Sequence, residues 1–175
     1  MTAELTRLPR LAQVSFRVTD RSRADVAGAL GLGVLPAANR FSPGDRLAVL
    51  WIGPDEFLAV SSVRDAAGIE SALRAAMPIG EGVVVDLSAG RVGLELAGPA
   101  ARDVLATCCA IDLHPRVFGP GSCVSTLIVK APVILFQTDD RPGFRLLVRP
   151  SFARYLTDWL SDGIVGIASA AAESA

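Results

Sequence analysis

Residues 123–148 read CVSTLIVKAPVILFQTDDRPGFRLLV, and this stretch predicts three consecutive β-strands. The expected strands are Cys123–Val129, Pro132–Thr138 and Gly143–Val148, which are apolar runs of strand length. The cluster Asp139–Gly143 between the last two is rich in turn-forming residues. Because strands joined by short turns pair in antiparallel fashion, the stretch favours an antiparallel sheet.

The rest of the chain places helices between such strand pairs. Leu47–Ile52 and Phe57–Val60 flank a Gly-Pro-Asp-Glu turn and predict a hairpin. Apolar residues at helical spacing predict a helix over Val63–Met77 and a second one that starts at Ser151. This pattern indicates an α+β fold, a mostly antiparallel sheet with helices packed on it.

The expected organisation is a single domain over residues 1–175. An irregular N-terminal segment is expected at about 1–12, irregular chain at Leu35–Asp45, and a flexible tail at about 164–175. Gly-Pro follows a strand at both Gly53 and Gly98, but different structures are expected after each, so no internal repeat is predicted.

Composition excludes several function classes. The 175 residues are 51% hydrophobic and carry a formal net charge of −1, which argues against disorder and against the basic surface of a nucleic-acid binder. The N-terminus has no apolar run typical of a signal peptide. Three cysteines, two of them adjacent, do not form a disulfide framework, so a cytoplasmic protein is expected.

Nucleophilic catalysis and metal binding find little support. His114 is the sole histidine, and no Gly-x-Ser-x-Gly motif accompanies it. Five residues are of types that could ligate a metal ion, but their spacing in the sequence matches no zinc motif. Packing of the thiols in the core is the favoured interpretation. The five residues are Cys108, Cys109, Asp112, His114 and Cys123.

The sequence also does not support phosphate binding or acid–base chemistry. The Gly28–Pro36 stretch lacks the spacing of a dinucleotide loop, and the neighbouring acids Asp55–Glu56 and Asp139–Asp140 lie in turns where acids are solvated. Asp86 is either a ligand carboxylate or, as favoured here, an aspartate that accepts hydrogen bonds in its own turn beside Ser88. The sequence therefore predicts no catalytic, cofactor-binding or metal-ligating residue.

Several stretches carry a family resemblance. They are LPAANRF (35–41), LWIGPDEFLAV (50–60), VVDLSAGRVGLELAGPAARDVLATCCAIDLHPRVFGPGSC (84–123) and RPSFARYLTDWL (149–160). Together they resemble the gamma subunit of heterotetrameric sarcosine oxidase, with Asp112–Pro115 and Gly121–Cys123 as the most specific motifs. Pro150 and Thr157 depart from the family's pattern, which leaves a divergent paralogue open.

The resemblance implies a fold with ferredoxin-like halves, similar to the folate-binding domain of the glycine-cleavage aminomethyltransferase. It also implies an αβγδ complex that converts sarcosine, tetrahydrofolate and oxygen to glycine, methylenetetrahydrofolate and hydrogen peroxide. In that family FAD and NAD belong to alpha, FMN to beta and its interface with alpha, and zinc to delta. The gamma chain carries no cofactor, and alpha is its expected direct partner.

Two functions of different class follow. The favoured one is a non-catalytic structural subunit that docks on the large flavin-bearing subunit of the complex. The alternative is a free-standing aminomethyltransferase-like folate-binding protein or one-carbon enzyme. The mean hydropathy of +0.43 leans towards the subunit, because obligate interfaces are large and apolar.

The expected docking segment is Ile111–Ser122, the longest irregular connection. Its proposed interface residues are Leu113, His114, Arg116, Val117 and Phe118. Arg116 beside Phe118 has the composition of an interface hot spot, with Phe118 as an apolar anchor. In the competing interpretation Phe118 fills the core of its own domain.

Overall fold

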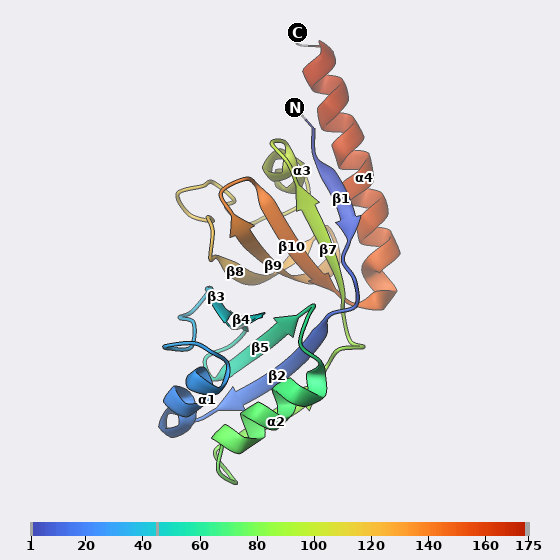
Figure 1. Ribbon diagram of the computed structural model, residues 1–175. Helices are drawn as coiled ribbons and strands as arrows, with labels where there is room; N and C mark the ends of the chain where they lie inside the picture. The colour runs from blue at the N-terminus through green and yellow to red at the C-terminus, as the bar shows by residue number, and fades with distance from the viewer. Residues whose placement is uncertain (1, 45, 174–175) are drawn as a thin grey trace. The chain divides into compact units, whose positions relative to one another are not determined.

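The computed structural model describes residues 2–44 and 46–173, and within them it shows an α+β fold with two antiparallel five-stranded sheets (Figure 1). The chain divides into two compact units, Pro9–Gly90 and Met1–Leu8 with Arg91–Ala175. The antiparallel sheets confirm the predicted fold class. The single domain over 1–175 stays a prediction, because two compact units can still unfold together.

The unit Pro9–Gly90 contains a sheet of strand order β3-β4-β5-β2-β6, here named the β2 sheet. Its elements are β2 (Ala12–Val18), the 3₁₀ turn η1 (Asp20–Ser22), α1 (Arg23–Ala29), β3 (Phe41–Gly44), β4 (Leu47–Trp51), β5 (Glu56–Ser61), α2 (Ala66–Ala76) and β6 (Gly82–Asp86). Helix α2 begins where the Asp65 side chain accepts a hydrogen bond from Gly68 N at 2.6 Å, which satisfies one free amide of the first turn. Its Ile69 and Leu73 are fully buried in the core with Phe16 and Phe57.

The second unit contains a sheet of strand order β1-β7-β10-β9-β8, here named the β7 sheet. Its elements are β1 (Glu4–Arg7), β7 (Val92–Ala97), α3 (Ala101–Ala106), β8 (Cys123–Ile128), β9 (Ala131–Asp139), β10 (Gly143–Val148) and α4 (Pro150–Glu173). Helix α4 starts at Pro150, whose missing N–H costs nothing in the first turn. Its Leu156 and Leu160 are fully buried in one core with Leu105 of α3 and Phe144 of β10.

Three segments that the sequence predicts to be irregular or flexible contain helix or strand. Glu4–Arg7 pairs with β7 as strand β1, and β3 lies within the expected irregular stretch Leu35–Asp45. The expected flexible tail from 164 continues helix α4 to Glu173, because Ile164 and Ile167 still pack against the core; residues 174–175 lie outside the described part. The irregular N-terminal segment was therefore wrong over Glu4–Arg7, while the flexibility of the tail stays a prediction.

The two units repeat one topology, which the sequence analysis did not predict. Each has a strand that lies next to the edge strand of its sheet (β2 or β7), followed in sequence by a short helix, three antiparallel strands and a second helix. The strand that completes the β2 sheet beside β2 is β6, which follows α2 in sequence. The equivalent place beside β7 is taken by β1 from the start of the chain, so the second unit is completed by a strand that is distant in sequence.

Several equivalent positions of the two units carry residues with corresponding roles. Val26 is equivalent to Val104, and Leu35 is equivalent to Leu113, because both pairs have the same sequence separation. All four residues are buried. At that spacing Arg17 corresponds to Glu95. Arg17 pairs with Glu56 of the neighbouring strand at 2.8 Å, and Glu95 pairs with Arg145 at 2.9 Å, so each half keeps a cross-strand ion pair with the charges exchanged.

Candidate functional site

The loop over residues 107–122, between α3 and β8, carries all five proposed interface residues. Within it, Asp112 Oδ1 accepts a hydrogen bond from His114 N at 2.8 Å. His114 Nδ1 accepts one from Arg116 N at 3.2 Å, and its carbonyl oxygen accepts from the amides of Val117 and Phe118 at 2.8 and 2.9 Å. These local hydrogen bonds give the loop a defined turn around His114.

Arg102 of α3 ties this loop to the core of its unit. Its Nη1 donates to the carbonyl oxygens of Leu113 and Phe118, the latter at 3.0 Å, and Nη2 donates to Gln137 Oε1 at 2.9 Å. The guanidinium carbon lies 5.1 Å from the centre of the Phe144 ring, a cation–π geometry. Burial lowers the pKa of Arg102 from its ordinary value. One arginine therefore satisfies three acceptors and positions both ends of the turn.

The turn divides the five residues into two groups. Leu113 and Phe118 are only 5% and 6% exposed and belong to the core of their own unit, where the Phe118 ring stacks on Phe144 at a centroid distance of 6.4 Å. Phe118 therefore lies in the core of its own unit, as the competing interpretation expects, while the interface role of the five residues stays a prediction. His114 and Arg116 are exposed, and the Val117 side chain is 62% exposed. The structure thus brings together an outward group of His114, Arg116 and Val117.

The sequence analysis missed Arg102. Arginine is the dominant basic residue of the chain, and no local pattern distinguishes Arg102 from the others. Its role depends on acceptors that lie at 113, 118 and 137, so only the folded structure identifies it.

The cysteines behave as core residues. Cys109 and Cys123 are buried and Cys108 is half-buried. Burial raises the pKa of Cys123 to about 12, and burial also raises the pKa of Cys108, so both thiols are protonated at neutral pH. Among residues 2–44 and 46–173, no group of three His, Cys, Asp or Glu side chains lies close enough to hold a metal ion.

Asp86 is the turn aspartate that the sequence favoured. Its Oδ1 accepts hydrogen bonds from Ser88 N at 2.8 Å and Ser88 Oγ at 2.5 Å, which lower the pKa of the carboxyl group. Ser88 Oγ in turn accepts from Gln13 N at 3.0 Å. The Asp86 carboxylate therefore orders the link between β6 and β7.

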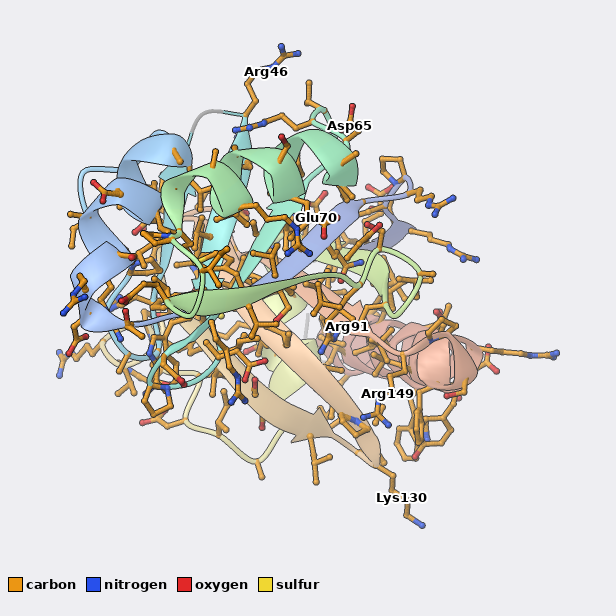
Figure 2. The ribbon with its side chains drawn as sticks, turned by 90° about the horizontal axis from the view of Figure 1, so that it is seen from below. Arg46, Asp65, Glu70, Arg91, Lys130 and Arg149 are labelled. Atoms are coloured by element: carbon orange, nitrogen blue, oxygen red, sulfur yellow. The ribbon has the colours of Figure 1, made fainter. Side chains whose placement is uncertain are left out.

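Lys130 at the β8–β9 turn and Arg46 before β4 are exposed, and both point away from the ribbon into solvent (Figure 2). None of the helices in the described part of the chain combines the length and apolar character that a bilayer crossing requires.

Comparison with known proteins identifies relatives over nearly the whole chain. Residues 18–166 match the model of the sarcosine oxidase, gamma subunit family. A sarcosine oxidase subunit gamma from Corynebacterium sp. (strain P-1) is 39% identical over 172 residues, which cover 96% of this chain and 83% of that protein.

Two solved structures share the fold. A heterotetrameric sarcosine oxidase from Corynebacterium sp. U-96, in complex with pyrrole 2-carboxylate, has a chain with a TM-score of 0.85 and 34% identity. The match covers 94% of this chain and 84% of that one. The glycine cleavage system aminomethyltransferase T from Bartonella henselae matches with a TM-score of 0.71 and 17% identity, over 91% of this chain and 45% of that one. This second likeness shows the fold alone and confirms the expected architecture.

Proposed function

Since the chain belongs to the sarcosine oxidase gamma subunit family, we propose that it is a non-catalytic subunit of a heterotetrameric sarcosine oxidase and docks on the large flavin-bearing subunit. The complex would convert sarcosine, tetrahydrofolate and oxygen to glycine, methylenetetrahydrofolate and hydrogen peroxide. In this proposal the flavins, NAD and zinc are held by the alpha, beta and delta subunits.

The observation that carries the docking proposal is the geometry of the 107–122 loop. Arg102 and the core residues Leu113 and Phe118 hold the loop from inside. The same turn leaves Val117 and Arg116 on the surface. A pre-ordered loop loses little conformational entropy on binding, which favours its use as a recognition element.

The outward group has the chemistry of an interface rather than of a catalyst. Val117 offers apolar surface and Arg116 offers a planar cation, a combination enriched at interface hot spots. His114 uses Nδ1 to accept a backbone hydrogen bond from Arg116 N. Its role in this arrangement is to shape the turn.

The test is co-expression with the alpha, beta and delta subunits, followed by purification of the assembled complex. Val117→Asp is expected to reduce recovery of this chain in the complex at least tenfold, while the isolated chain keeps its melting temperature. Val63→Asp is the matched control, because Val63 is exposed to a similar degree (56%) and lies in the other unit. Equal assembly of wild type, Val117→Asp and Val63→Asp would contradict docking through the loop.

The non-catalytic role has its own test. In complexes purified to full assembly, His114→Gln is expected to leave the turnover of sarcosine unchanged. A large fall in turnover at full assembly would instead assign a catalytic role to this chain.

A further inference from the structure

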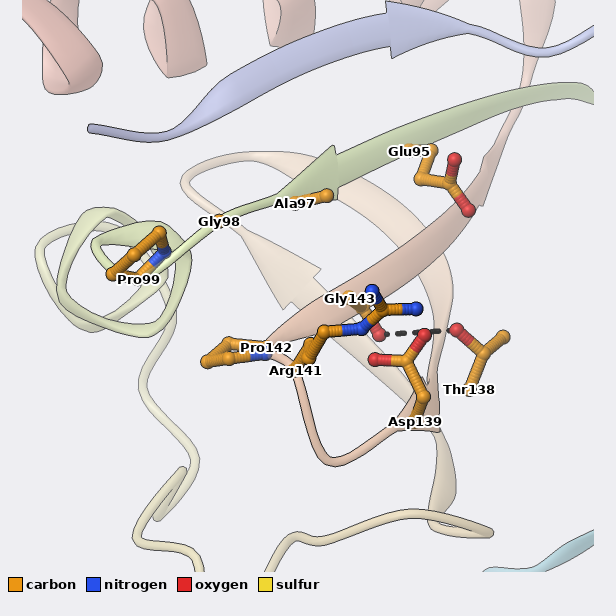
Figure 3. Close-up of a pocket in the computed structure, with 9 residues that line it drawn as sticks. All are labelled: Glu95, Ala97, Gly98, Pro99, Thr138, Asp139, Arg141, Pro142 and Gly143. Atoms are coloured by element: carbon orange, nitrogen blue, oxygen red, sulfur yellow. Dashed lines mark hydrogen bonds between the residues drawn. The ribbon is translucent and has the colours of Figure 1, made fainter.

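A pocket of about 450 Å³ lies in the second unit, where β7 leads into α3 and the β9–β10 hairpin turns (Figure 3). Ala97 and Gly98 form one wall, and Pro142 and Gly143 form the other. The amide of Gly98 donates to Pro142 O at 3.1 Å and ties the two walls together. The volume is in the usual range for a small-molecule site, and the walls are largely free of long side chains.

Charged groups of both signs border this pocket. Figure 3 shows Glu95, Asp139 and Arg141 around the space between β7 and the hairpin. Glu95 is engaged through Oε1 with Arg145 Nε at 2.9 Å. Among the described residues, neither the Arg141 guanidinium nor the Asp139 carboxylate has a hydrogen-bond or ion-pair partner. The pocket therefore offers one free cation and one free anion beside a second carboxylate.

This arrangement selects among classes of ligand. A simple anion would meet the Asp139 and Glu95 carboxylates, and a simple cation would meet the Arg141 guanidinium, so each is opposed by like charge. A molecule with a carboxylate at one end and an ammonium at the other satisfies both signs. The formal charges of Glu95, Arg145, Asp139 and Arg141 cancel, which matches a ligand of no net charge.

We propose that this pocket binds a small α-amino acid in its zwitterionic form. Its carboxylate contacts Arg141, whose fork of N–H donors fits a carboxylate, and its ammonium group contacts Asp139 and Glu95. The aliphatic walls at Ala97 and Pro142 take the carbon atoms. Sarcosine and glycine belong to this ligand class. The pocket shares no residue with the 107–122 loop, so this proposal is independent of the docking proposal, and each can fail without the other.

The experiment is a titration of the full ¹⁵N-labelled chain with glycine and with sarcosine, followed by NMR. Shifts are expected at the backbone amides of Gly98 and Gly143. Propionate, which lacks the amine, and ethylamine, which lacks the carboxylate, are expected to bind at least about tenfold more weakly, the loss that about 1.4 kcal/mol of interaction represents.

Variants assign the binding to this pocket. Arg141→Gln and Asp139→Asn are each expected to weaken binding of glycine and sarcosine at least tenfold. Asp140→Asn is the matched control, because Asp140 lies in the same turn, is exposed, and does not line the pocket. Ala97→Leu tests the pocket by volume alone: Ala97 lines the pocket, so the added carbons are expected to fill part of it and to weaken binding of glycine and sarcosine.

Three results would overturn the proposal. The first is an affinity for glycine and sarcosine that Asp139→Asn changes no more than Asp140→Asn does. The second is a set of shifts that excludes Gly98 and Gly143, or no shift at millimolar ligand. The third is propionate binding as tightly as glycine, which would make this an anion site.

Discussion

Replacing Arg102 should destabilise the unit that contains it more than replacing any exposed arginine. Arg102→Leu removes the cation over the Phe144 ring and every donor to Leu113 O, Phe118 O and Gln137 Oε1. Leaving a buried acceptor without its partner costs about 1–3 kcal/mol. Because the three bonds share one side chain and are not additive, the expected loss is about 3–5 kcal/mol.

The assay is thermal unfolding of the isolated chain. For a protein of this size each kcal/mol corresponds to about 2–4 °C, so the melting temperature should fall by about 6 °C or more. Arg154→Leu is the control: the Arg154 side chain is 95% exposed and its distance to Asp158 is 3.8 Å, an ion pair of little expected value. Its melting temperature should stay within about 2 °C of wild type.

The loop offers a second readout in the same variant. The Arg116–Val117 bond is exposed and is a substrate site for trypsin, but the ordered turn should protect it. Arg102→Leu should accelerate cleavage there well below the melting temperature, while Arg102→Lys, which keeps a cationic donor, should show an intermediate rate. A wild-type melting temperature and a wild-type cleavage rate in Arg102→Leu would refute the role given to this residue.

Three further predictions follow from local geometry. With a pKa of about 12, Cys123 should not react with a thiolate-specific disulfide reagent at pH 8 until the chain is unfolded in guanidinium; rapid reaction of the native protein would contradict its burial. The pKa of Asp86 is lowered in the folded state, so its carboxylate adds stability above its unfolded pKa of about 3.9, and this is lost as pH falls through that value and below. Asp86→Asn should therefore melt below wild type at pH 7, the difference should shrink as pH falls below the unfolded pKa and through the lower folded pKa, and a pH-independent difference would refute the assignment. Gly98→Ala should lower the melting temperature, because Gly98 has φ +113° and an added Cβ would lie 2.7 Å from Thr2 O; Gly166→Ala, with nothing within 4 Å of its added Cβ, should not.

The sequence predicts best the elements whose signal is local. The hairpin around Gly-Pro-Asp-Glu and the strands from Cys123 to Val148 are long apolar runs with strong turn signals, and the structure confirms them. Strand β1 gives no such signal, because it has four residues and is specified by its pairing with β7, far along the chain. Strand β3 is equally short and contains Pro43. Short edge strands take their structure from partners that a local pattern does not contain.

The 107–122 loop was predictable as an irregular segment, but the exposure of its individual side chains was not. Irregular length and composition located the loop, whereas exposure is decided by which side chains the core accepts. Val117 and Phe118 are adjacent and both apolar, yet one is 62% exposed and the other 6%. The difference arises because the hydrogen bonds of the turn and of Arg102 orient residue 118 inwards.

The internal repeat supports a specialised role for this loop. The two halves keep one spacing as far as Leu35 and its equivalent Leu113, which are buried to nearly the same extent. Beyond these leucines they diverge, because more residues separate Leu113 from β8 than separate Leu35 from β3. The longer connection is the one that contains the turn exposing Arg116 and Val117. Because the other half closes its sheet with a shorter connection, the sheet itself does not require this turn. Its cost in conformational entropy, and the arginine that orders it, are therefore best explained by what the turn presents at the surface.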